Sequence, residues 1–172
     1  MEHLDENVLK TEMRTIWKIW AACFHALIAY AFVCHYLQKE VPYFKEYDLP
    51  LQVLKYSSYA LSLIAFFLCH YVRKNMLERP SIKSDLKIIE RARKKGKPPI
   101  VFKYTTIVMV TIAFSEAICL LGVAYFFLSR DFQTLYALLA ISAITMVVYR
   151  PKLKELASIS IASEASRDAS FA

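Results

Sequence analysis

Residues 105–128 read TTIVMVTIAFSEAICLLGVAYFFL, an apolar run that contains a single ionisable residue, Glu116. A run of this length is sufficient for a helix that crosses a hydrocarbon core roughly 30 Å thick. An unpaired carboxylate in that core costs roughly 2.5 to 3.5 kcal/mol even on lenient insertion scales. We therefore expect Glu116 to be protonated, to have a partner, or to face a protein-lined or aqueous interior.

Other apolar runs of comparable length indicate further transmembrane helices. The predicted spans cover residues 16–37, 53–72, 104–128 and 132–149. Of the 172 residues 57% are hydrophobic, and little sequence remains for a water-soluble domain. The first run is too long and too poor in small residues at its end for a cleavable signal peptide. We predict an all-α four-transmembrane-helix bundle that forms one integral membrane domain over residues 1–156.

The charge distribution predicts the orientation of this bundle. Residues 73–103 contain eleven Lys or Arg residues against three acidic residues, a net charge of +8, whereas the whole chain carries +7. By the positive-inside rule this basic loop lies in the cytoplasm, and the alternation of spans places both termini there too. The tail at residues 157–172 is rich in Ser and Ala and is predicted to be mobile.

Within the basic loop, Ile82, Leu86 and Ile89 recur at helical spacing. This predicts an amphipathic helix over residues 81–95 that lies on the inner leaflet. Its cations could contact RNA or DNA, but their position beside membrane spans favours anionic lipids, and no nucleic-acid partner is predicted. The residues predicted to contact lipid headgroups are Lys83, Lys87, Arg91, Arg93, Lys94, Lys95 and Lys97.

Polar residues of several spans fall at similar depth when counted from the inner face. At 1.5 Å per residue Glu116 lies about 18 Å past Tyr104, and His25 lies about 13 to 14 Å past Ile16. His25 is thus the ionisable candidate partner of Glu116 in an intramembrane polar cluster. The alternative is a protonated Glu116 that binds a backbone or hydroxyl group and fixes helix register. The predicted cluster comprises Glu116, His25, Ser115, Ser58, Ser62, Ser142 and Thr145.

Cysteine and histidine do not indicate a metal site. Cys23, Cys34, Cys69 and Cys119 lie in apolar runs without a CxxC motif, which is typical of small buried hydrophobic residues. Cys-His-Tyr closes two of the spans, at residues 34–36 and 69–71. Because those spans run in opposite directions, their histidines would lie at opposite faces, and haem has little support as a cofactor.

The run from Glu116 to Phe127, EAICLLGVAYFF, resembles the carboxylate-bearing helix of rotary ATP synthase subunit c. The resemblance implies that the carboxylate carries a translocated proton or sodium ion. This chain differs from that family in its four spans, its basic loop and its lack of a Gly-rich helix. The half of the chain from the basic loop to residues 149–152 also resembles small uncharacterised bacterial membrane proteins, which implies a bacterial inner membrane.

Three classes of function remain open. The first is a non-enzymatic accessory or scaffold protein that packs against partner membrane subunits or forms a homo-oligomer. The second is a proton or ion carrier that uses Glu116. The third is a membrane enzyme or haem protein acting on lipid or quinone, which ranks last because the sequence contains no nucleophile and base pair and no catalytic residue can be named. The scaffold hypothesis requires the fewest assumptions and is preferred.

Overall fold

A computed structural model describes residues 6–40, 50–78 and 98–159. Every regular element in these ranges is a helix, so the all-α prediction is confirmed for the described residues. The amphipathic helix predicted at residues 81–95, and with it all seven predicted headgroup contacts, lies outside them. The long helices are α1 (Glu6–Glu40), α2 (Leu51–Glu78), α4 (Pro99–Ser129) and α5 (Phe132–Val148), and a short helix covers Leu153–Ile159.

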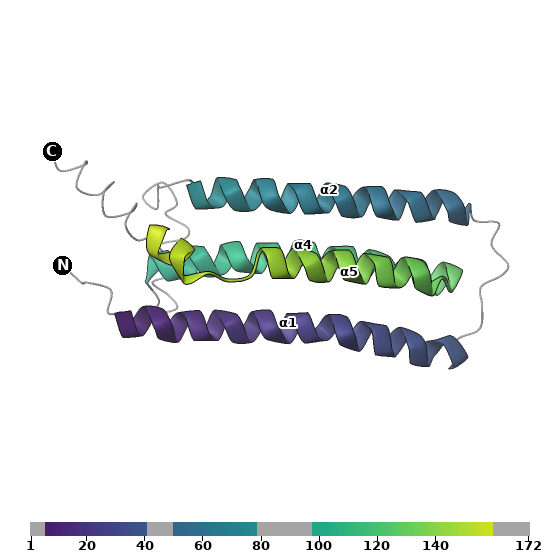
Figure 1. The fold of residues 1–172 in the computed structure, drawn as a ribbon, viewed down its shortest axis with the longest axis horizontal. Coiled ribbons are helices and arrows are strands. Elements are labelled where there is room, and N and C mark those ends of the chain that lie inside the picture. The colour runs from purple at the N-terminus through teal and green to yellow at the C-terminus, as the bar shows by residue number, and fades with distance from the viewer. Residues whose placement is uncertain (1–5, 41–49, 79–97, 160–172) are drawn as a thin grey trace.

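The long helices run alternately up and down, with α4 and α5 together in the middle and α1 and α2 on opposite sides of that pair (Figure 1). The helices α1, α2 and α4 are long and apolar enough to cross a membrane. A fourth crossing is counted if α5 and the helix Leu153–Ile159, which are bent by 53° relative to each other, form one broken span. The described part of the chain is therefore all-helical and contains three to four candidate membrane spans.

The helix α1 packs on the central pair through a seven-residue pattern. Spacings of three and four residues place one stripe of side chains toward α4 and α5, and Trp20 in this stripe donates a hydrogen bond from Nε1 to the carbonyl oxygen of Met146 (3.1 Å). The stripe consists of Met13, Ile16, Trp20, Cys23, Leu27, Tyr30 and Cys34. Seven residues per two turns keep this stripe facing its neighbours along most of α1.

The helix α2 buries polar side chains and exposes apolar ones, which is the reverse of a helix in a water-soluble protein. Its buried side chains are small or polar, namely Ser58, Ser62, Cys69 and Arg73. Its exposed side chains include Val53, Leu61, Leu63, Ile64, Phe67 and Leu68. A soluble protein buries the apolar stripe of such a helix, whereas lipid solvates it. This distribution supports an integral membrane protein.

The central helices α4 and α5 approach closely. A Cβ atom added to Gly122 would lie 3.0 Å from Cβ of Leu138, so glycine permits the contact. The hydroxyl of Ser142 donates to the carbonyl oxygen of Ser115 (2.6 Å), which links α5 to the backbone of α4. The connection of only a few residues makes these helices antiparallel neighbours, as the sequence predicts.

Charged groups bound an apolar belt. Lys55 marks one end of α2 through its ion pair with Asp131 (2.9 Å), and Arg73 marks the other. The eighteen residues from Lys55 to Arg73 correspond to about 27 Å of helix, close to the thickness of a hydrocarbon core. We refer to these levels as the Asp131 end and the Arg73 end. The start of α1, the end of α2, the start of α4 and the helix Leu153–Ile159 all lie at the Arg73 end (Figure 1).

Residues 157–159 differ from the sequence prediction. They were expected to belong to a mobile tail, but they complete the short helix, in which Leu156 and Ile159 are buried in the core. This helix covers the part of α4 that extends beyond the end of α5. The remainder of the predicted tail, residues 160–172, lies outside the described residues.

Candidate functional site

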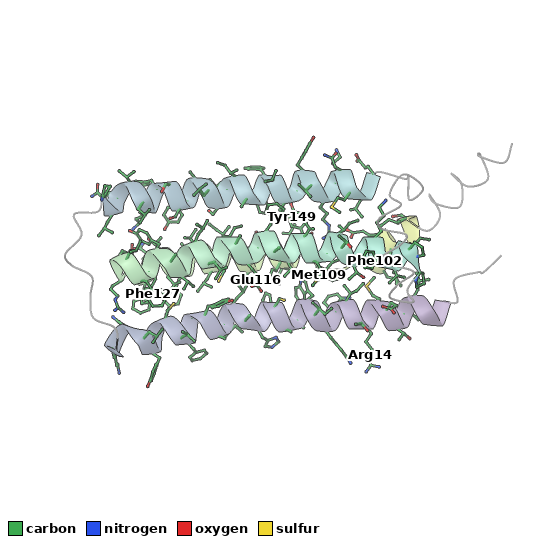
Figure 2. The ribbon with its side chains drawn as sticks, turned by 180° about the vertical axis from the view of Figure 1, so that it is seen from behind. Arg14, Phe102, Met109, Glu116, Phe127 and Tyr149 are labelled. Carbon is green, nitrogen blue, oxygen red and sulfur yellow. The ribbon has the colours of Figure 1, made fainter. Side chains whose placement is uncertain are left out.

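Glu116 lies on the side of α4 that faces α1 (Figure 2). Its side chain is half-buried. The thiol of Cys23 on α1 lies within hydrogen-bonding reach of the Glu116 carboxyl group. The carboxyl group therefore sits in the α1–α4 interface beside a thiol.

His25 occupies a different position from the one expected. Its side chain is exposed, and its Nδ1 is 2.7 Å from the carbonyl oxygen of Ala21 on the same helix. Because successive helical residues are rotated by about 100°, His25 points about 200° away from Cys23, although the two residues differ in height by only about 3 Å. The two residues thus lie at nearly the same depth but on opposite faces of α1. Cys23 takes the place beside Glu116 that the sequence analysis gave to His25.

The predicted hydroxyl residues act mainly in helix packing. Ser58 donates to the carbonyl oxygen of Leu54 (2.8 Å), Ser62 to that of Tyr59 (2.7 Å) and Thr145 to that of Ile141 (2.7 Å). Each of these bonds lies within one helix. Of the seven residues of the predicted cluster, the structure joins Ser115 to Ser142 by a hydrogen bond. The hydroxyls therefore permit close packing, as small polar residues do in membrane helices.

The thiols follow the prediction that they are small buried residues. Cys34, Cys69 and Cys119 are buried, and all four cysteines are free. Within the part of the chain that the structure describes, no group of three or more His, Cys, Asp or Glu residues could hold a metal ion.

The two Cys-His-Tyr segments lie far apart. The ring of His35 packs on Phe132 at the start of α5, whereas Nδ1 of His70 contacts the hydroxyl of Tyr149 just past its end (3.0 Å). Phe132 and Tyr149 are separated by about 25 Å along the helix. This agrees with the expectation that His35 and His70 cannot ligate one haem.

A buried arginine organises a polar site at the end of α2. Arg73 is 5% exposed and was assigned by the sequence analysis to the basic loop. Its Nη1 donates to Oγ1 of Thr111 (3.2 Å) and to the carbonyl oxygen of Tyr149 (2.9 Å), and its Nη2 donates to Oε2 of Glu155 (2.6 Å). The guanidinium carbon also lies 5.6 Å from the centroid of the Tyr149 ring. One side chain thereby connects α2, α4 and the segment that follows α5.

Tyr104 extends this network. Its hydroxyl accepts a hydrogen bond from the backbone nitrogen of Lys152 (2.7 Å) and lies 3.2 Å from Oε2 of Glu155. The break after α5 exposes backbone groups that a regular helix would satisfy internally. Tyr104 and Arg73 bind those groups. Irregular backbone is therefore tolerated at the Arg73 end, because protein covers it there. The sequence contains a signal for the burial of Arg73, because Arg73 shares a helix face with Ser58, Ser62 and Cys69.

A second polar site closes the Asp131 end. Oδ1 of Asp131 accepts from the backbone nitrogens of Gln133 (2.9 Å) and Thr134 (3.2 Å) and so caps α5, while Oδ2 binds Lys55 on α2. Burial alone would raise the pKa of Asp131, but the hydrogen bonds from Lys55 and Thr134 outweigh it and lower this pKa from 3.8 to about 2. The preceding residue, Arg130, adopts a left-handed conformation (φ 58°) and caps α4. This site fixes the turn and ties it to α2.

The polar interior thus contains two connected sites, at the Asp131 end and the Arg73 end, and Glu116 between them. No buried side-chain nitrogen or oxygen in the described residues lacks a hydrogen-bond partner. Comparison of the chain with protein-family models, with curated proteins and with solved structures finds no match.

Proposed function

We propose that the protein is a non-enzymatic accessory or scaffold protein of four membrane spans that packs against partner membrane subunits. The observation that carries this proposal is the contrast between its interior and its outer faces. In the described residues every buried side-chain nitrogen and oxygen has a hydrogen-bond partner, and several of these partners are backbone carbonyl oxygens. The outer faces of α1 and α2 carry large exposed apolar side chains, among them Phe32 (72%) and Phe67 (67%). These faces are accessible to another membrane helix.

The proposed topology places both termini in the cytoplasm. The described helices carry an excess of cations at the Arg73 end, beyond the ion pair of Arg73 and Glu155 itself. The exposed cations there include Arg14, Lys18, Lys74, Arg150, Lys152 and Lys154. This excess adds to that of the basic loop, and anionic lipids of the inner leaflet are the expected headgroup partners. The Arg73 end is therefore proposed to be the cytoplasmic end.

Cysteine labelling tests the topology. In a cysteine-free background, Gln52→Cys should react with a membrane-impermeant maleimide in intact spheroplasts, because Gln52 is exposed near the Asp131 end. Ser158→Cys, which is exposed at the Arg73 end, should react only after permeabilisation. The reverse pattern would show that the orientation is inverted, and labelling of both positions in intact cells would contradict the four-span topology.

Site-specific photo-crosslinking tests the scaffold role. A photoreactive amino acid at Phe67, on the outer face of α2, should give a discrete crosslinked protein band in native membranes. The same probe at Ile118, which is fully buried, serves as the matched control and should give none. Crosslinks to lipid alone at Phe67 and at Phe32 would argue against a protein partner.

The second candidate function is a proton carrier that uses Glu116. The observation in its favour is that this half-buried carboxyl group lies beside the thiol of Cys23 in the α1–α4 interface. A proton carrier should produce proton flux in proteoliposomes. Glu116→Gln should abolish this flux while the variant retains its helical content. A scaffold predicts that Glu116→Gln leaves both flux and folding unchanged, because glutamine preserves the size and the hydrogen-bonding capacity of the side chain.

A further inference from the structure

Glu116 and His25 keep hydrogen-bonding capacity toward the surroundings of the bundle. The Glu116 carboxyl group is half-buried beside the thiol of Cys23, which is a weak donor, and none of the ion pairs among the described residues includes it. The carbonyl oxygen of Ala21, 2.7 Å from Nδ1 of His25, has no proton to donate, so the hydrogen of the neutral ring lies on Nδ1. Nε2 is then an acceptor, and the described residues provide no partner for it.

The two groups lie at the same level of the bundle. Cys23 is within hydrogen-bonding reach of Glu116, and His25 is two residues further along α1, which is a rise of about 3 Å. Trp20 and His35, on either side of His25, both contact α5, so α1 runs alongside α5 through the apolar belt and His25 lies within that belt. Ionisable residues at such depth almost always face protein or water rather than lipid. Each group therefore requires a neighbour with a polar side chain at this level.

The two groups belong to different outer faces of the chain. His25 is exposed on the face of α1 directed away from Glu116. Glu116 lies at the edge of the outer face of α4, onto which Figure 2 looks, with Met109 and Phe127 labelled on either side of it. Alanines on both faces allow a second backbone to approach closely. The exposed residues are Lys18, Ala22, His25, Ala29, Phe32 and Tyr36 on α1, and Met109, Ala113, Ala117, Leu120 and Ala124 on α4.

We infer that α1 of one copy of this chain packs on the outer face of α4 of a second copy, with a hydrogen bond between His25 and Glu116 of the partner subunit. In one chain His25 and Glu116 point away from each other. Copies inserted with one topology and at one depth are parallel, so His25 of one copy lies within about 3 Å of the level of Glu116 of the partner subunit. The acid and the base of the chain are thus complementary between copies.

The bond uses the hydrogen positions that each copy has available. The carboxyl O–H of Glu116 donates to Nε2 of His25, while Nδ1–H of the same ring remains bound to the carbonyl oxygen of Ala21. Transfer of that proton to Nε2 turns the same contact into an ion pair of carboxylate and imidazolium. One proton therefore satisfies both groups in either arrangement. Hydrocarbon chains of lipid offer neither an acid nor a base at this level, so the contact favours a second copy over lipid.

The inference rests on the proposed four-span topology but not on the identity of any other partner. It is tested with the purified full chain in liposomes, labelled at the amino terminus with a donor or an acceptor dye. Energy transfer measured over a series of protein-to-lipid ratios gives the dissociation constant of the contact between copies. We expect His25→Leu and Glu116→Leu each to raise this constant about tenfold, as loss of an interhelical hydrogen bond does in membranes.

A mixture of the two variants tests whether the residues act from different copies. Donor-labelled His25→Leu keeps Glu116, and acceptor-labelled Glu116→Leu keeps His25, so a mixed pair retains one contact between an acid and a base. We expect the mixture to associate more tightly than either variant with itself. A residue that acted only within its own chain would give no such rescue.

Two variants serve as controls. Glu116→Gln keeps an N–H donor for Nε2 and should associate as the wild-type chain does. Ala60→Leu changes an exposed position of α2 and should have no effect. Circular dichroism verifies that every variant is helical. The inference is overturned by energy transfer of the wild-type chain no greater than random collision, by a constant that either leucine variant leaves unchanged, or by a mixture no tighter than its components. None of these results affects the cysteine-labelling or crosslinking tests of the proposed function.

Discussion

Removal of Glu155 should destabilise the protein more than removal of any exposed acidic residue. The Glu155 carboxylate is the counter-charge of Arg73, which is 5% exposed, and the two groups are 2.6 Å apart. Removing one partner of a buried ion pair typically costs about 3 to 5 kcal/mol because the other charge stays buried without compensation. Glu155 itself is 21% exposed, and Arg73 keeps its bonds to Thr111 and to the backbone of Tyr149. We therefore expect Glu155→Ala to lower the free energy of unfolding by about 2 to 3 kcal/mol.

The assay is equilibrium unfolding in mixed micelles, in which increasing fractions of dodecyl sulfate unfold the helices and circular dichroism reports the transition. Glu78→Ala is the matched control, because Glu78 forms an exposed ion pair with Lys74 (3.9 Å) and should contribute less than about 0.5 kcal/mol. A double variant sharpens the result. In Arg73→Met with Glu155→Leu neither charge of this ion pair remains, so the double variant should be more stable than Glu155→Ala.

Two outcomes would refute this reasoning. If Glu155→Ala changes the free energy of unfolding no more than Glu78→Ala does, the carboxylate is not the compensating charge of Arg73. If the double variant is as unstable as Glu155→Ala alone, the loss arises from packing of the C-terminal helix and not from an isolated guanidinium.

Three further predictions concern other contacts of the bundle. Gly122→Leu should lower the free energy of unfolding by about 1 to 3 kcal/mol in the same assay, because a Cβ at this position would already lie 3.0 Å from Leu138. Trp20→Phe should cost about 1 kcal/mol through loss of the bond to the carbonyl oxygen of Met146, and a matched loss should be absent for Trp17→Phe. The lowered pKa of Asp131 contributes stability that is fully present above its unfolded pKa of 3.8 and is lost as the pH falls through about 2. Asp131→Asn should remove this part of the pH dependence of the free energy of unfolding. The free energy of unfolding of both proteins, measured between pH 5 and pH 2, tests this prediction.

The sequence was most informative about features that depend on length and hydropathy. The central apolar run, the second span and the antiparallel pair of α4 and α5 were predicted because a span requires about twenty apolar residues and a very short turn admits one arrangement. The seven-residue stripe of α1 was also readable, since Met13 to Cys34 follow it without interruption. Depth along the helices does not reveal this stripe, because residues at one depth can lie on opposite faces of a helix.

The position of Arg73 could not be found by counting charges. The positive-inside rule assigns a cation to a side of the membrane from its place in the chain and does not state whether it is buried. The helix face of Arg73 is defined by Ser58, Ser62 and Cys69, whose burial depends on contacts with α4. Its partner Glu155 follows a helix break after α5, and no pattern in the sequence predicted this break. Such a pairing depends on tertiary structure.

The inner face of α1 determines what Glu116 can do. Cys23 on this face lies within hydrogen-bonding reach of the Glu116 carboxyl group. A proton carrier would require α1 to move away from α4 so that water reaches the carboxyl group. The hydrogen bond from Trp20 to the carbonyl oxygen of Met146 holds α1 on the central pair and resists such a movement. Proton flux that is equal in the wild-type chain and in Glu116→Gln would therefore favour a structural role for the carboxyl group.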